Sequence, residues 1–130
     1  IGRRHVRSNN SWMHNFTKLM AGKPRCTLQM HPDDAERLDL RPADRVSVRS
    51  KTGAIEVELE LSDEVMRGVV SLPHGFGHNQ PGARLRVAEQ AGHAGASIND
   101  LIDPRRIDEL SGVAALSGER VRVELVDART

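Results

Sequence analysis

The stretch that most constrains the fold runs from residue 55 to residue 61, where apolar and acidic side chains alternate. The alternating residues are Ile55, Val57, Leu59 and Leu61 on one side and Glu56, Glu58 and Glu60 on the other. Because successive side chains of a strand point to opposite faces, this pattern predicts a strand with one buried and one solvated face. Acids repeated along one side of a strand do not converge on a point, so we interpret the glutamates as a solvated face rather than as catalytic carboxylates.

Further short segments extend this strand into a sheet. Val46 and Val48 alternate with polar residues, and Gly53 lies in the connection to the acidic strand, which predicts a hairpin. We also expect strands at 1–7, 26–30, 69–72 and 121–125, a short helix from Pro32, helical segments at 12–20 and 81–91, and a loop with a turn of helix at 105–118. Five or six short strands with small helices between them predict one mostly β domain over residues 1–130, closed as a barrel.

Composition excludes several classes of protein. The 19 Lys and Arg residues nearly balance the 18 Asp and Glu residues, which argues against a nucleic-acid binder. No apolar run approaches the roughly 20 residues that span a bilayer, so we expect no membrane segment. The single cysteine, Cys26, fits a reducing compartment and hence a cytoplasmic protein, and its apolar alternating position predicts a buried, inert thiol. A first residue Ile1 inside an expected strand suggests a fragment of a longer polypeptide.

Three polar loops adjoin the expected strands, and they hold the chemistry of this sequence. They comprise residues 7–15, 73–79 and 97–100 and supply amide side chains, arginines, glycines and the only tryptophan, Trp12. The first seven residues carry three arginines and one histidine without an acid. A barrel would gather such loops at one rim, and their inventory suits a planar, hydrogen-bonding, anionic ligand better than it suits catalysis.

Other kinds of site fit these loops less well. His74 and His78 have a spacing that suits metal ligation on a helix, but the glycines between them disfavour a helix and no third ligand follows. We therefore expect Gly75 and Gly77 to let the backbone approach a ligand closely. The sequence also contains no nucleophile elbow, Walker A motif or dinucleotide fingerprint.

The order of these motifs resembles that of a known family. The segments that carry the resemblance are Gly2-Arg3 with Arg7-Ser8-Asn9-Asn10-Ser11-Trp12-Met13-His14-Asn15, Met30-His31-Pro32-Asp33-Asp34-Ala35 with Asp44-Arg45-Val46-Ser47-Val48, Gly53 with Gly68-Val69-Val70 and Pro73-His74-Gly75, Asn99-Asp100-Leu101 with Asp103-Pro104, and Leu110-Ser111-Gly112 with Val121-Arg122-Val123. Together they cover nearly the whole chain and resemble the C-terminal molybdopterin-dinucleotide-binding domain of the molybdopterin oxidoreductases, which include dimethyl sulfoxide reductase, nitrate reductase and formate dehydrogenase.

The resemblance implies a double-psi β-barrel with short flanking helices that binds the pterin portion of a bis(molybdopterin guanine dinucleotide) cofactor. Molybdenum or tungsten and its ligand would belong to upstream domains of the same polypeptide, so the fragment alone would be inactive and would contain neither catalytic nor metal-binding residues. The residues that the resemblance assigns to the cofactor are Arg3, Arg7, Ser8, Asn9, Asn10, Ser11, Trp12, His74, Gly75 and Asn99. His14 and Asn15 are expected to brace the loop instead.

Some alternatives stay open at this point. The residues of the loops favour a formate-dehydrogenase-like or nitrate-reductase-like parent without choosing between them. Several family members have a long polar residue before the closing strand, where this chain has Ser117, so a contact there is in doubt. A stand-alone psi-barrel that recognises a protein or substrate is the competing function. A nucleic-acid-binding barrel is disfavoured by the acidic strand and by the few aromatic residues.

Overall fold

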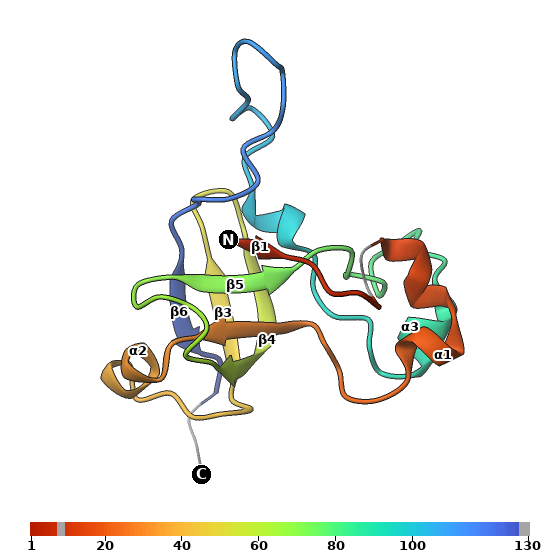
Figure 1. The fold of residues 1–130 in the computed structure, drawn as a ribbon, viewed down its shortest axis with the longest axis horizontal. Coiled ribbons are helices and arrows are strands. Elements are labelled where there is room, and N and C mark those ends of the chain that lie inside the picture. Colours follow the sequence, from red (N-terminus) through yellow and green to blue (C-terminus); the bar gives the residue numbers. More distant parts are fainter. Residues whose placement is uncertain (8–9, 128–130) are drawn as a thin grey trace.

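The computed structural model describes residues 1–7 and 10–127, whose short strands form one mixed sheet (Figure 1). The strands of the described residues are β1 (Gly2–Arg3), β2 (Thr27–Met30), β3 (Arg45–Arg49), β4 (Ala54–Leu61), β5 (Val70–Pro73) and β6 (Arg122–Leu125). Their order in the sheet is β1-β5-β2-β4-β3-β6. The helices are η1 (Ser11–Asn15), α1 (Thr17–Met20), α2 (Pro32–Arg37), α3 (Arg86–Gln90) and η2 (Ile98–Leu101), where η denotes a 3-10 helix.

The alternating strands fold as their pattern predicts. β3 and β4 pair antiparallel with Val46 opposite Val57 and Val48 opposite Ile55. Exposed and buried residues alternate along β4 up to Glu60, so the solvated acidic face is confirmed. The last of these acids has a further role, because Glu60 accepts a hydrogen bond from the Thr27 hydroxyl across the β2–β4 pair.

Most strands that are neighbours in the sheet are not consecutive in the chain, so the sheet joins segments that are distant in sequence. β2 pairs parallel with β4 and antiparallel with β5, and β1 pairs parallel with β5. β1 and β6 are the two edges, and the Gly2 N–H donates to Ser117 Oγ at 3.3 Å just before β6. A mostly β fold is therefore observed, whereas the double-psi form of the barrel stays a prediction, because no ladder joins β1 to β6 among the described residues.

The core is aliphatic, as the scarcity of aromatic residues requires. Leu28, Met30 and Leu59 are at most 2% exposed and lie on neighbouring strands. Cys26 is 8% exposed, so its predicted burial is confirmed, and this burial raises the pKa of its thiol. Removal of this apolar surface from water supplies the main force that holds the sheet together.

Two expected elements differ from the structure. The first strand is limited to Gly2–Arg3 instead of covering residues 1–7. The expected turn of helix at 105–118 is wrong, because a single antiparallel bridge between Ile107 and Ala114 orders that segment. Gly112 has a φ of 71°, in the left-handed region that glycine tolerates, and it turns the chain between the two bridged residues. The apolar side chains of the segment are exposed, so no buried face holds a helical turn there.

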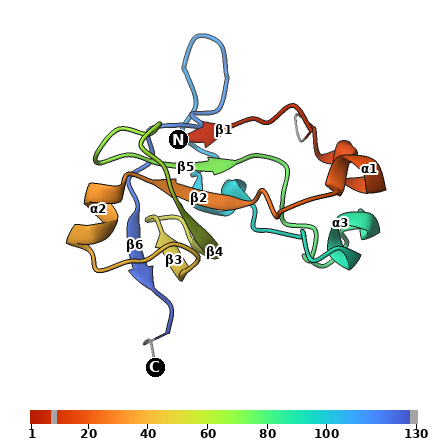
Figure 2. The same ribbon diagram turned by 60° about the horizontal axis from the view of Figure 1, so that its bottom comes forward.

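A small helical lobe lies beside the sheet and carries the first polar loop. η1, α1 and α3 contact one another there, and both views place them apart from α2, which lies at the other end of the sheet (Figure 1, Figure 2). The expected helical segment at 12–20 is divided between η1 and α1 at Phe16, whose backbone is extended. None of the helices in the described part of the chain is long and apolar enough to cross a membrane.

Candidate functional site

The first two polar loops meet at Gly75. A Cβ atom on Gly75 would lie 3.4 Å from the backbone of Ser11 and 3.3 Å from the ring of His14. The residue also has a φ of 88°, which a side chain would strain. Glycine at this position therefore lets the loop after β5 pass directly against η1, and two loops distant in sequence form one surface.

A buried histidine fastens these two loops together. His14 is fully buried, its Nδ1 lies 2.6 Å from His78 Nε2, and its ring stacks on Phe76 with centroids 4.2 Å apart. Burial, His78 and Arg25 lower the pKa of His14 from 6.5 to about 4, so the ring is neutral near pH 7. His14 braces the loop as predicted, and so does Asn15, whose side-chain oxygen accepts from the Val87 N–H at 3.3 Å.

The third loop joins the same surface at Gly77. A Cβ atom on Gly77 would lie 3.0 Å from Ser97 Cβ, and the φ of Gly77 is 107°. The N–H groups of Gly77 and His78 both donate to the Ala94 carbonyl, at 2.7 and 3.0 Å. Ser97 immediately precedes η2, which carries Asn99, so the contacts connect all three loops in the order that the sequence predicted.

Arg3 is bonded within the protein. Its guanidinium donates to the carbonyl oxygens of Ser71 on β5 and Thr27 on β2, the latter at 2.8 Å, and to Thr27 Oγ1 at 3.1 Å. These bonds tie β1 to its neighbour β5 and to β2 beyond it, at the entry to the first loop. Arg3 therefore positions the loop through its side chain, and its positive charge lies close to the loop surface.

Positive charge is concentrated at the beginning of the first loop. Burial comes first among the causes that lower the pKa of His5, followed by the charges of Arg25, Arg7 and Arg3. Burial also lowers the pKa of His74, with Arg4 as the second cause. Arg25 lies far from the others in sequence, and the tertiary fold brings it to them. Sequence reasoning missed it, although the acid-free segment 1–7 gave the signal for the rest of the group.

The remaining predicted residues differ in their surroundings. Arg7, Asn10, Ser11 and Asn99 are exposed, and Trp12 is 57% exposed with its ring edge-on to Phe16. Asn10 precedes η1 without a side-chain cap bond, so its amide is available to a ligand. His74 is half-buried, and its ring lies against Gly2 of β1, where an added Cβ atom would come within 2.2 Å of His74 Nε2. Ser8 and Asn9 lie outside the described residues.

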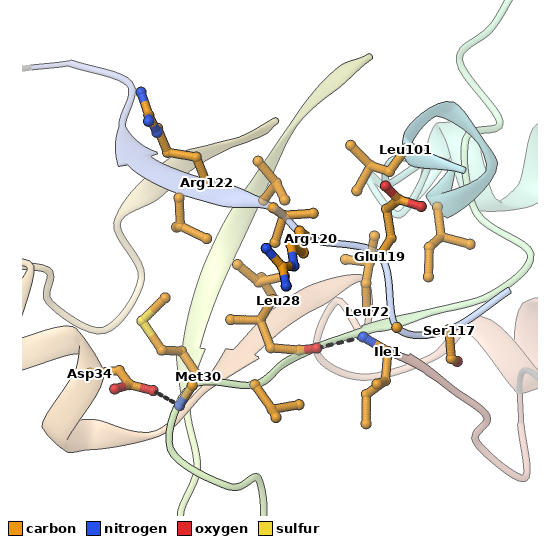
Figure 3. Close-up of a pocket in the computed structure, with 18 of the residues that line it drawn as sticks. Ile1, Leu28, Met30, Asp34, Leu72, Leu101, Ser117, Glu119, Arg120 and Arg122 are labelled. Carbon is orange, nitrogen blue, oxygen red and sulfur yellow. Dashed lines mark hydrogen bonds between the residues drawn. The ribbon is translucent and has the colours of Figure 1, made fainter. Parts of the chain in front are cut away.

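A separate cavity of about 630 Å³ lies between β1 and the segment that leads into β6 (Figure 3). Its walls include Leu28, Leu72 and Leu101, together with Ser117 and Arg120 from the segment before β6 (Figure 3). None of the predicted cofactor residues that the structure describes lines it. Its mostly apolar lining lacks the dense set of amides that a pterin edge requires, so we place the candidate site at the three loops.

The described residues contain no group of three or more His, Cys, Asp or Glu side chains that could hold a metal ion. The side chains of His74 and His78 do not lie together. His78 points inward to His14, whereas the ring of His74 packs against Gly2 of β1. The site therefore offers arginines, amides and one flat aromatic ring, which suit an anionic heteroaromatic ligand.

Comparison with known proteins identifies a family that matches most of the chain. The family described as "Molydopterin dinucleotide binding domain" matches residues 1–119. One subunit of the tetrathionate reductase of Salmonella typhimurium is 30% identical over 119 residues, which are 80% of this chain and 12% of that protein. ArrA, the molybdopterin-containing subunit of the arsenate respiratory reductase of Chrysiogenes arsenatis, is 33% identical over 127 residues, 93% of this chain and 14% of that protein.

A solved structure shares the fold. Acetylene hydratase from Pelobacter acetylenicus superposes with a TM-score of 0.74 at 19% sequence identity, over 96% of this chain and 18% of that one. The chain thus spans about an eighth of the length of the two curated relatives. Neither of them is a formate dehydrogenase or a nitrate reductase.

Proposed function

Because the chain belongs to the molydopterin dinucleotide binding domain family, we propose that its three joined loops bind a molybdopterin guanine dinucleotide cofactor as one domain of a larger oxidoreductase. The cofactor's metal supplies the redox chemistry when the group is bound. The cationic loop surface is the observation that carries the assignment to these residues. After burial, the charges of Arg25, Arg7 and Arg3 lower the pKa of His5 there, and arginines are suited to binding the pyrophosphate of a dinucleotide.

The residues present fit this group in shape as well as in charge. Gly75 and Gly77 each occupy a position where a side chain would meet a neighbouring loop, so the three loops form a continuous backbone surface. Exposed amides at Asn10 and Asn99 supply paired donors and acceptors for a pterin edge. The exposed ring of Trp12 offers a flat apolar face beside them.

Each part of the chain contributes a distinct function to binding. We assign Arg7 to the anionic part of the ligand, and Asn10 and Asn99 to the hydrogen-bonding edge of the pterin. Arg3 and His14 position these residues through their bonds to Thr27 and His78. His74 is neutral near pH 7, because its pKa is lowered by burial and by Arg4, and it presents a neutral donor or acceptor to the ligand.

The parent enzyme that we propose reduces an inorganic oxyanion. Support comes from the names of the two relatives, which belong to a tetrathionate reductase and to an arsenate respiratory reductase and refer to oxyanions. The nitrate-reductase-like parent expected from sequence falls in the same substrate class, whereas a formate-dehydrogenase-like parent is the alternative. Residues outside this chain select the substrate, so its identity is tested on the complete enzyme.

The binding assignment is tested by titrating the isotopically labelled chain with guanosine diphosphate and, separately, with pterin. We expect the amide resonances of Ser11, Trp12, Gly75 and Asn99 to move. Arg7→Ala should weaken binding of the diphosphate about tenfold, and Arg49→Ala, which removes an exposed arginine of β3, serves as the control. Movement confined to residues around the cavity, such as Leu72 and Val121, would refute the site.

A further inference from the structure

A second surface of the chain is apolar and faces solvent. Residues 105–118, which we call the arm, project from the sheet between η2 and β6 and lie apart from the helical lobe in both views (Figure 1, Figure 2). The arm exposes Ile107, Leu110, Val113 and Leu116, at 53%, 99%, 62% and 44% respectively. Single exposed apolar residues are ordinary, but four on one short projection mark an interaction site.

The arm is ordered by its own backbone. The Asp108 N–H donates to the Val113 carbonyl at 2.9 Å, and the Ala115 N–H donates to the Arg106 carbonyl at 2.9 Å. At the tip, the Asp108 carboxylate accepts from the N–H and the hydroxyl of Ser111, at 2.8 and 2.7 Å. These bonds lower the pKa of Asp108. A preformed arm loses less conformational freedom on binding than a flexible loop would lose.

The arm carries two arginines and two acids, and the arginines are paired with acids at its base. Arg105 makes two bonds to the Asp103 carboxylate, each at 3.1 Å, and Arg106 pairs with Glu119. Its four exposed apolar side chains outnumber the two acids, Asp108 and Glu109, that lie between them. Such a surface fits an apolar recess in another folded body better than it fits a charged ligand or a nucleic acid.

We propose that the arm docks into another domain of the same polypeptide, an inference that rests on the proposed membership in a larger oxidoreductase. The matched region is 12% and 14% of the two relatives, so most of each relative lies outside it. A tethered domain has a high effective concentration at the arm, so four apolar side chains suffice to hold it. The base of the arm is fixed to β1 by the bond from Gly2 to Ser117, and β1 leads directly into the first polar loop. Docking of the arm therefore sets the loop surface relative to the domain that holds the other side of the cofactor.

The test is photo-crosslinking in the full-length enzyme. Leu110→p-benzoylphenylalanine places the reactive group at the tip of the arm, and Val113→p-benzoylphenylalanine provides a second position. Asp63→p-benzoylphenylalanine, in the exposed turn after β4, is the control. Pterin content, measured by fluorescence after oxidation, reports separately on the proposed cofactor function. Digestion and mass spectrometry of a mixture of heavy and light enzyme identify the crosslinked peptides and separate contacts within one chain from contacts between copies.

We expect both arm positions to crosslink, within one polypeptide, to peptides outside residues 1–130, at a yield at least fivefold above that of the control. The inference is overturned if the crosslinks reach only a second copy, another subunit or residues 1–130. It is also overturned if neither position crosslinks while pterin is retained. Unmodified enzyme gives an independent measure, because a docked arm resists trypsin at Arg105 and Arg106, whereas rapid cleavage there would contradict docking. Absence of pterin from the unmodified enzyme would refute the proposed function, and the crosslinks would still report on the arm.

Discussion

His14 makes the stability of the helical lobe depend on pH. The pKa of this buried ring is lowered from 6.5 to about 4, chiefly by burial, and His78 and Arg25 act in the same direction. Above pH 6.5 the ring is neutral in both the folded and the unfolded chain, so its titration has no effect on stability. As pH falls from 6.5 to 4, the unfolded chain binds a proton that the folded chain excludes, and the free energy of unfolding falls. Below pH 4 both states bind the proton and the loss stops growing.

The size of this loss follows from the two pKa values. A lowering from 6.5 to about 4 corresponds to at most about 3.4 kcal/mol, because each unit of pKa is about 1.4 kcal/mol. His14→Phe keeps a ring on Phe76 but removes the titrating group and the bond to His78. We therefore expect this variant to be about 1–3 kcal/mol less stable than the wild type at pH 7, because it leaves His78 without a partner. At pH 4 the difference should shrink or reverse.

Urea unfolding between pH 7 and pH 4 measures the free energy of unfolding of the wild type and of His14→Phe. The signals are circular dichroism and the fluorescence of Trp12, which lies in η1. Phe76→Leu is the matched control, since it removes the stacking partner and keeps the titrating imidazole, so its stability should follow the wild-type dependence on pH. If the wild type and His14→Phe lose stability in parallel between pH 6.5 and pH 4, His14 is not the titrating group and the argument fails.

Three further substitutions test the packing, each measured as the change in free energy of unfolding. Leu28→Ala should lower it by about 2–5 kcal/mol, because Leu28 is 1% exposed in the core, and a loss under 1 kcal/mol would contradict that burial. Gly95→Ala should lower the free energy of unfolding by more than about 1 kcal/mol, because the φ of Gly95 is 65° and an added Cβ would lie 2.6 Å from Cys26 Cβ. An unchanged value would contradict this close contact. Ser50→Ala should lower the free energy of unfolding by about 1–2 kcal/mol through loss of the 2.7 Å bond to the Leu101 carbonyl, and the reference is Ser62→Ala, whose hydroxyl accepts only from an exposed turn.

The sequence determined the strands more closely than it determined the loops. Alternation at 55–61 predicted β4 because a strand with one buried face has no other periodicity to follow. The same reasoning located β3, and residues 26–30 and 121–125 gave β2 and β6 to within one residue at each end. The turn of helix expected in the arm is wrong. A bridge between Ile107 and Ala114 orders the segment instead, and its exposed apolar residues have no buried face that would favour a helix.

The sequence predicted which loops form the candidate site better than it predicted what each side chain contacts. Gly75 and Gly77 were expected to let the backbone approach a ligand, which stays a prediction; the structure shows that both glycines lie against other loops, at η1 and at Ser97. The family resemblance assigned Arg3 to the cofactor, and in the structure its guanidinium donates hydrogen bonds to carbonyl oxygens of β2 and β5. Arg25 joins the cationic group through tertiary folding alone, which no local pattern encodes.

The two exposed surfaces of this chain, the cationic loops and the apolar arm, are both unfavourable in water, for different physical reasons. A concentration of arginines repels itself, and an apolar arm orders water around it, so each is unfavourable for a chain that acts alone. β1 connects them, because Gly2 is bonded to Ser117 at the base of the arm while Arg3 leads into the cationic loop. A body that covers the arm consequently fixes the strand from which the ligand loop starts. Cofactor binding and docking should therefore be coupled, so that loss of the arm contact weakens cofactor retention in the full-length enzyme, although no residue of the arm lies among the three loops.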